Sequence, residues 1–122
     1  MDYRVRQVLK LMEADLRRPV TLPELAGFVN LSDSRFRHIF KAETGKTPVR
    51  YLKELRLRQA RHLAEPTFLS VKQIMNRVGI CDASHFVRDF ERLYGLSPAR
   101  LRVVALSASM RQPQNIRKRI RQ

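Results

Sequence analysis

The chain has no tryptophan, a single cysteine and only four glycines among its 122 residues. Because Cys81 has no second cysteine to pair with, an intrachain disulfide bond is excluded, and a lone thiol fits a reducing compartment. No apolar run approaches the ~20 residues needed to span a bilayer, and the N-terminus lacks the uninterrupted apolar stretch of a signal peptide. These absences lead us to expect a cytoplasmic protein without membrane contact.

Acidic residues are also scarce, with 11 Asp and Glu against 25 Lys and Arg and a formal net charge of +14. A positive field of this size attracts polyanions, and nucleic acid is the usual one. Charge alone also allows a ribosome-like structural role or a role at a membrane surface.

Sequence signatures of catalysis are missing as well. The chain has no glycine-rich phosphate loop, no cluster of paired carboxylates and no nucleophile elbow, so we expect neither an enzyme nor a cofactor. Cys81 and His85 are spaced like two metal ligands on a helix, but zinc needs four ligands and His62 is the only other nearby candidate. We therefore expect no metal site and interpret Cys81 as a small apolar residue.

Helical periodicity is what the chain has in abundance. Apolar residues recur with helical spacing along most of its length, for example Phe36, Ile39 and Phe40. The pattern predicts an all-α protein of about seven helices. They cover residues 2–16, 21–29, 32–44, 48–65, 70–78, 82–94 and a short segment that begins near 97.

Several predicted helices begin with residues that suit a helix N-terminus. Thr21 with Glu24, and Ser70 with Gln73, have the spacing of capping boxes, in which each side chain bonds a free backbone N–H of the other residue. A short side-chain oxygen at the N-cap and a glycine at the C-terminus are further end signals. These further positions are Ser32 or Asp33, Asp82, Gly45 and Gly95.

An internal repeat divides the chain into two similar units. Two phenylalanines, a glycine and a proline recur in the same order at an offset of 50 residues. The pairs are Phe36 with Phe86, Phe40 with Phe90, Gly45 with Gly95 and Pro48 with Pro98. Upstream the offset is 49, which places a one-residue insertion at Cys81. Each unit has the order helix, tight turn, helix, so we expect two helix-turn-helix subdomains joined by a long linker helix, a homeodomain-like pair.

The repeat also predicts the domain organisation. We expect the first helix-turn-helix subdomain over residues 1–47, the linker helix over 48–65 and the second subdomain over 66–103. Residues 104–122 are expected to form a flexible tail, because from 103 onward there are five basic residues, no acidic one and no clear period. Such a tail either adds phosphate contacts or is solvated without a specific role.

This pattern resembles the DNA-binding domain of the AraC/XylS family of bacterial transcription regulators. The resemblance covers roughly residues 5–102. In the first unit and the linker helix it lies in LPELAGFVNLS and FRHIFKAETGKTPVRYLKELRLRQARHLA. In the second unit it lies in VKQIMNRVGI and DASHFVRDFERLYGLSPARLR. Three positions depart from the family pattern. Ile80 replaces a common phenylalanine and Met75 a usual alanine, which suggests local repacking of the second unit. His38 replaces a common arginine and so bears on the base preference at one contact.

A helix-turn-helix places its second helix in the major groove of duplex DNA. In the first unit we expect Ser34, Arg37 and His38 to meet base edges, because arginine can bond guanine O6 and N7 in a bidentate way. The corresponding base-reading positions of the second unit are Ala83, Ser84, Val87 and Arg88. This second face is less polar, and Ala83 or Val87 is suited to touch a thymine methyl group.

Three further basic residues are better placed for the phosphate backbone, which gives affinity without sequence information. They are Arg35, Lys41 and His85. The linker helix is expected to hold the two recognition helices about one DNA turn, ~34 Å, apart. We expect Arg56, near the apolar side of that helix, to be a partly buried residue paired with a carboxylate rather than a DNA contact.

Double-stranded DNA is therefore the expected partner, and two unlike units favour binding by a monomer to an asymmetric site. The resemblance implies activation through contact with RNA polymerase. We expect no small-molecule effector within cores so small. A sequence-independent architectural protein is the rival function. Because the helical pattern begins at Met1, we expect either a compact regulator or the DNA-binding fragment of a longer one.

Overall fold

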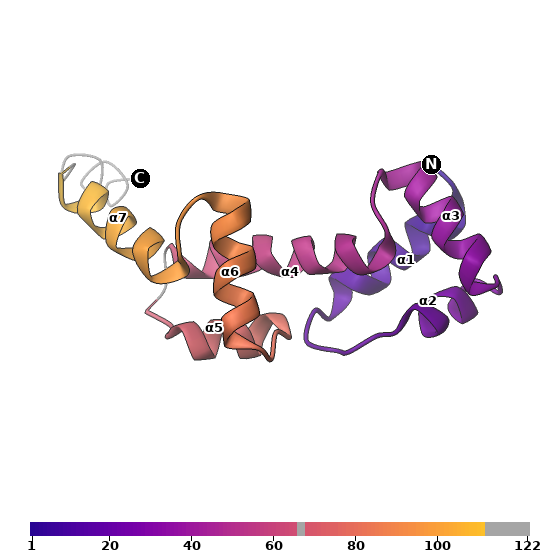
Figure 1. The fold of residues 1–122 in the computed structure, drawn as a ribbon, viewed down its shortest axis with the longest axis horizontal. Coiled ribbons are helices and arrows are strands. Elements are labelled where there is room, and N and C mark those ends of the chain that lie inside the picture. Colours follow the sequence, from indigo (N-terminus) through magenta and orange to yellow (C-terminus); the bar gives the residue numbers. More distant parts are fainter. Residues whose placement is uncertain (66–67, 112–122) are drawn as a thin grey trace, which may run out of the picture.

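The computed structural model describes residues 1–65 and 68–111, and every regular element in these ranges is an α-helix. The helices form two groups at the two ends of one long helix, α4, which lies along the length of the molecule (Figure 1). The helices are α1 (Tyr3–Ala14), α2 (Leu22–Phe28), α3 (Asp33–Thr44), α4 (Pro48–Ala64), α5 (Val71–Val78), α6 (Ala83–Tyr94) and α7 (Pro98–Arg111). The predicted all-α fold with seven helices is confirmed.

Two separate apolar cores hold these groups together. The first is built from Val5, Val8, Met12, Leu25, Ala26, Val29, Phe36, Phe40 and Leu52. The second is built from Leu57, Ala60, Ala64, Ile74, Met75, Val78, Phe86, Phe90 and Leu101. The division falls inside α4, because Leu52 belongs to one core and Leu57 to the other. The linker helix is therefore part of both subdomains.

Most local signals for helix ends act as predicted, but the predicted capping box of Thr21 and Glu24 is only half formed. The Thr21 hydroxyl accepts from the Glu24 N–H at 3.3 Å, whereas the Glu24 carboxylate bonds that hydroxyl and not the Thr21 backbone N–H. Ser32, rather than Asp33, is the N-cap of α3, and its hydroxyl accepts a hydrogen bond from the Arg35 backbone N–H at 3.2 Å. Ser70 and Gln73 form the full capping box of α5. Asp82 accepts the His85 N–H at 2.9 Å at the start of α6. Each helix-turn-helix unit therefore has its second helix started by a specific side chain.

Removing the α5 cap gives a direct test of this local contribution. We expect Ser70→Ala to lower the free energy of unfolding by about 1 kcal/mol, because the Gln73 N–H loses its partner. Ser107→Ala inside α7, where the side chain is exposed, is the control and should change stability by less than about 0.5 kcal/mol. Chemical denaturation monitored by circular dichroism measures both, and equal effects would contradict the capping role.

The last helix is longer than the sequence suggested. We predicted a short helix and a flexible tail from residue 104, but α7 continues to Arg111. The reason is that alanine, leucine and arginine favour helix and no proline occurs between Pro98 and Pro113. Val103, Val104 and Leu106 are exposed on this extension, so intrinsic propensity rather than core packing accounts for it. The rest of the predicted tail, 112–122, lies outside the described residues.

Arg56 is partly buried in α4, as expected, but its predicted carboxylate partner is wrong. Its Nε donates to the Leu16 carbonyl at 3.1 Å, and one terminal nitrogen donates to the Arg18 carbonyl at 3.2 Å. Burial lowers the pKa of this guanidinium below its usual value. Arg56 thus attaches α4 to the loop of residues 15–21, which we call the α1–α2 loop.

Candidate nucleic-acid interface

The helix α3 is fixed to the first core by its aromatic stripe. Phe36 and Phe40 are fully buried, with ring centroids 5.7 Å apart, and Phe40 meets Tyr51 of α4 edge to face at 5.5 Å. Gly45 ends the helix with a φ of +80°, a left-handed conformation that glycine adopts without strain. This anchoring leaves the opposite face of α3 in solvent.

The outer face of α3 carries all five of the residues predicted to contact DNA in the first unit. These exposed side chains are Ser34, Arg35, Arg37, His38 and Lys41. Within residues 1–65 and 68–111, none of the basic side chains among them makes an ion pair. Their charges are therefore available to an external anion.

The helix α6 is built in the same way on the second core. Phe86 and Phe90 are fully buried with ring centroids 5.8 Å apart, and Phe90 packs against Tyr94 at 4.9 Å. Ala83, Ser84 and Arg88 are exposed. Val87 is half-buried and packs against the second core, so only part of this side chain is free to meet a base.

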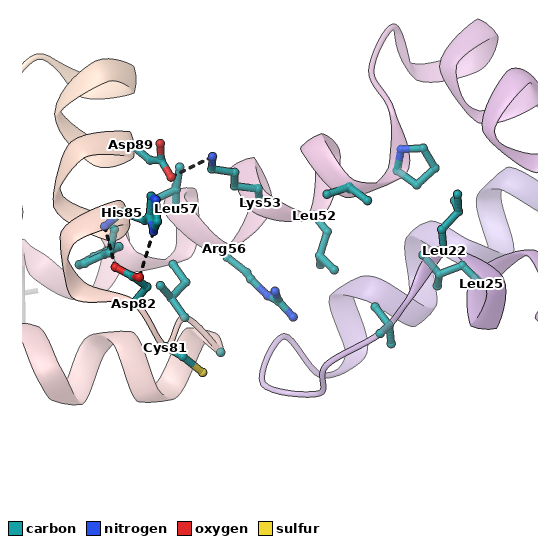
Figure 2. A pocket seen from close by; sticks show the side chains of 16 residues that line it. Leu22, Leu25, Leu52, Lys53, Arg56, Leu57, Cys81, Asp82, His85 and Asp89 are labelled. Atoms are coloured by element: carbon teal, nitrogen blue, oxygen red, sulfur yellow. Dashed lines mark hydrogen bonds and ion pairs between the residues drawn. The ribbon is translucent and has the colours of Figure 1, made fainter. Parts of the chain in front are cut away.

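His85 lies in a different environment from the other predicted contacts. Its Nδ1 is 3.0 Å from the Asp82 carboxylate, and its backbone N–H also donates to that carboxylate. These hydrogen bonds, the backbone one first, lower the pKa of Asp82 below its usual value. Both side chains line a groove beside α4, together with Asp89 (Figure 2). A phosphate near His85 would thus lie close to negative charge.

Ion pairs orient α6 and the start of α4. Lys53 of α4 forms an ion pair with Asp89 of α6 at 2.8 Å, which ties these two helices together (Figure 2). Lys46 and Arg50 both pair with Glu54 and lower the pKa of its carboxyl, Lys46 more strongly. These basic residues are paired with carboxylates inside the protein, so the net charge overstates the number of cations that are available to DNA.

Residues 1–65 and 68–111 hold neither a cluster of metal-binding side chains nor a membrane-spanning helix. There, no three His, Cys, Asp or Glu side chains gather closely enough to hold a metal ion. No helix in the same ranges combines the length and apolar character needed to cross a bilayer.

Known proteins share this architecture. A family described as a helix-turn-helix domain matches residues 25–103. The transcriptional activator RhaS of Enterobacter sp. (strain 638) is 37% identical over 101 residues, 83% of this chain and 36% of that protein. An AraC-type transcriptional regulator structure from Chromobacterium violaceum has a TM-score of 0.75 at 29% identity and covers 82% of this chain and 89% of that one.

A further solved structure is the DNA-binding domain of the global transcriptional factor AdpA in complex with a target DNA. Its TM-score is 0.80 at 27% identity, with 93% of this chain and 99% of that chain covered. Fold, repeat and matches define a double helix-turn-helix DNA-binding domain. The chain belongs to the AraC/XylS family of transcriptional regulators. It spans about a quarter to a third of the length of curated relatives that it matches.

Proposed function

We propose that this domain regulates transcription by reading two adjacent major-groove segments of one duplex, with α3 in one segment and α6 in the next. The main support is the outer face of α3, whose basic side chains pair with no acidic group of residues 1–65 or 68–111, on a helix fixed by buried aromatics. In the other group of helices (Figure 1), α6 is likewise held by buried phenylalanines and exposes Arg88. With 17 residues at ~1.5 Å each, α4 spans about 25 Å, which suits helices one DNA turn apart.

The two units are expected to read DNA by different chemistry. In α3, Arg37 and His38 supply hydrogen bonds to base edges, and Ser34 donates or accepts. In α6, Arg88 supplies the hydrogen bonds, Ser84 assists, and the methyl groups of Ala83 and Val87 fit thymine. We expect Arg35, Lys41 and His85 to contact phosphates. At His85 a phosphate would have to approach beside the Asp82 carboxylate, which lies 3.0 Å from the ring Nδ1.

Selection from a random duplex library, followed by sequencing of the bound pool, tests this function. We expect two enriched blocks with centres about 10 bp apart. A pool without enrichment, bound tightly only at low salt, would instead identify a sequence-independent architectural protein. A basic protein of either kind binds any duplex at low salt, so the selection has to be run at physiological salt.

Lys41 gives a separate test of the phosphate contacts. We expect Lys41→Ala to weaken binding to all duplexes alike and to reduce the slope of log K against log salt by about one, because one phosphate loses its cation. Fluorescence anisotropy over a salt series measures this slope. Lys10→Ala in α1, also exposed, is the control and should leave the slope unchanged. A sequence-dependent loss in Lys41→Ala would contradict the assignment.

Further features of the regulator follow from the same proposal. We infer that the domain binds as a monomer, since two unlike units supply both contacts to an asymmetric site. Activation through RNA polymerase and a cytoplasmic location fit relatives such as the activator RhaS. We infer no effector site, no metal and no enzymatic activity in this domain.

A further inference from the structure

The second helix-turn-helix unit touches the first at one tightly packed point. A Cβ placed on Gly79 would overlap the Leu16 carbonyl oxygen and would lie 2.9 Å from the Arg17 Cα. Both are backbone atoms of the α1–α2 loop, which belongs to the first subdomain. Backbone cannot rotate away as a long side chain does, so the turn at Gly79 fits against this loop only without a side chain.

Backbone conformation alone does not require glycine at this position. The equivalent turn residue of the first unit is Asn30, which has a φ of +57° against +78° for Gly79. Asparagine tolerates left-handed conformations, and the first unit uses it. The two turns share their hydrogen bonding, since Leu31 N–H donates to the Ala26 carbonyl and Ile80 N–H to the Met75 carbonyl, both at 2.9 Å. The close approach to the loop is what distinguishes Gly79.

Arg56 fixes the same loop from the other side. Its guanidinium bonds the carbonyls of Leu16 and Arg18, so Leu16 accepts from Arg56 while it packs against Gly79. In Figure 2, Arg56 extends from α4 away from the Lys53–Asp89 pair and toward the loop. The α1–α2 loop is thus held between the linker helix and the turn of the second unit.

Direct helix–helix packing between the two subdomains is sparse among the described residues. Among the described residues, the main helix–helix contacts connect α4 to both groups, and none of them connects α1, α2 or α3 directly to α5, α6 or α7. A groove of about 460 Å³ separates the groups on this side of α4, lined by Leu22 and Leu25 of one and by Ile80 and Phe86 of the other. The orientation of the units therefore depends on α4 and on the contact at the loop.

We propose that Gly79 and Arg56 are positioning residues that clamp the α1–α2 loop, and that this clamp sets which half-site spacing the domain accepts. The consequence for spacing rests on the proposed function, whereas the clamp itself does not. Without it, α4 alone would fix the orientation of the two units, and bending of this helix between its two cores would let α6 follow a half-site that is displaced along the duplex. One added base pair displaces a half-site by ~3.4 Å and rotates it by ~34–36°.

Distances between spin labels in the free protein test the clamp. The spin labels are attached at Glu43→Cys of α3 and Glu91→Cys of α6, both exposed positions, in a Cys81→Ser background. The distance between the labels reports how the two helices are placed relative to each other. We expect one narrow distance distribution in this background and a shifted or broadened one after Gly79→Asn. Indistinguishable distributions would overturn the clamp.

The chain offers matched controls for both positioning residues. Gly95 has a φ of +84° and open space around it, so Gly95→Asn introduces the same residue in the same conformation without the collision. It should leave the distribution unchanged. Arg56→Met should broaden the distribution, while Arg58→Met, which removes an equal charge from an exposed position of α4, should not. If Gly79→Asn fails to fold, the comparison of Arg56→Met with Arg58→Met still tests the clamp.

Binding to duplexes with altered half-site spacing tests the consequence. When one base pair is inserted between the selected half-sites, we expect the affinity of the unmodified chain to fall about tenfold or more. The affinity of Arg56→Met should fall about twofold or less on the same insertion, relative to its own affinity for the original duplex. Equal losses in Arg56→Met and Arg58→Met would overturn the spacing role. A random library without enrichment would refute the proposed function, yet the spin-label distances would still test the clamp.

Discussion

Arg37→Ala is expected to weaken binding to the selected duplex by about 1–3 kcal/mol and to relax the base preference at one position. Arg37 is exposed on α3 and makes no ion pair with any residue of 1–65 or 68–111. A bidentate contact to guanine would therefore cost the protein no internal partner. Anisotropy titrations on the selected duplex and on random duplex measure the difference.

A second substitution separates geometry from charge at the same position. Arg37→Lys keeps the positive charge but loses the planar pair of donors. We expect it to retain the affinity for random duplex and to lose most of the discrimination that Arg37→Ala loses. If Arg37→Ala weakened selected and random duplexes equally, Arg37 would be a phosphate contact and base reading would have to come from its neighbours.

Phe40→Ala is expected to lower the free energy of unfolding of the first subdomain by about 3–5 kcal/mol. The ring is 0% exposed and contacts Phe36 and Tyr51, so its removal leaves a cavity between α3 and α4. Such a loss is a large fraction of the ~5–15 kcal/mol that stabilises a typical domain. Thermal or urea unfolding followed by far-ultraviolet circular dichroism measures it.

Phe68 supplies the control for this deletion. Its side chain is 96% exposed, and Phe68→Ala should change stability by less than about 0.5 kcal/mol. The residue removed is the same in both variants, so burial alone separates them. A loss below about 1 kcal/mol in Phe40→Ala would mean that the first core collapses around the missing ring.

Local chemistry made most of the fold predictable. Helix caps such as Ser70 and apolar stripes such as Phe36 with Phe40 act over three or four residues, and the sequence displays them directly. The repeat then placed Phe86 and Phe90 in an equivalent core, which the structure contains. The exposed positions on α3 followed from the same periodicity, because the face opposite a buried stripe must be in solvent.

Contacts between distant segments were beyond the same reasoning. Arg56 reaches carbonyls of a loop about 40 residues earlier, and no local pattern selects a carbonyl over a carboxylate as its partner. The approach of Gly79 to Leu16 likewise depends on how two subdomains meet. Within α6, the sequence placed Val87 on the base-reading face, but the structure has it half-buried against the second core, because packing decides how much of such a side chain is covered. The DNA contacts assigned to the side chains of α3 and α6 stay predictions.

The division of apolar side chains within α4 has a consequence for how such a protein changes over generations. The two cores share no buried residue, and substitutions that are far apart and share no partners combine almost additively. Under the proposed binding mode, in which each unit reads one half of the operator, a lineage can therefore alter one half while it inherits the other half unchanged. Every intermediate then retains one working contact, so a new target can be reached by small steps.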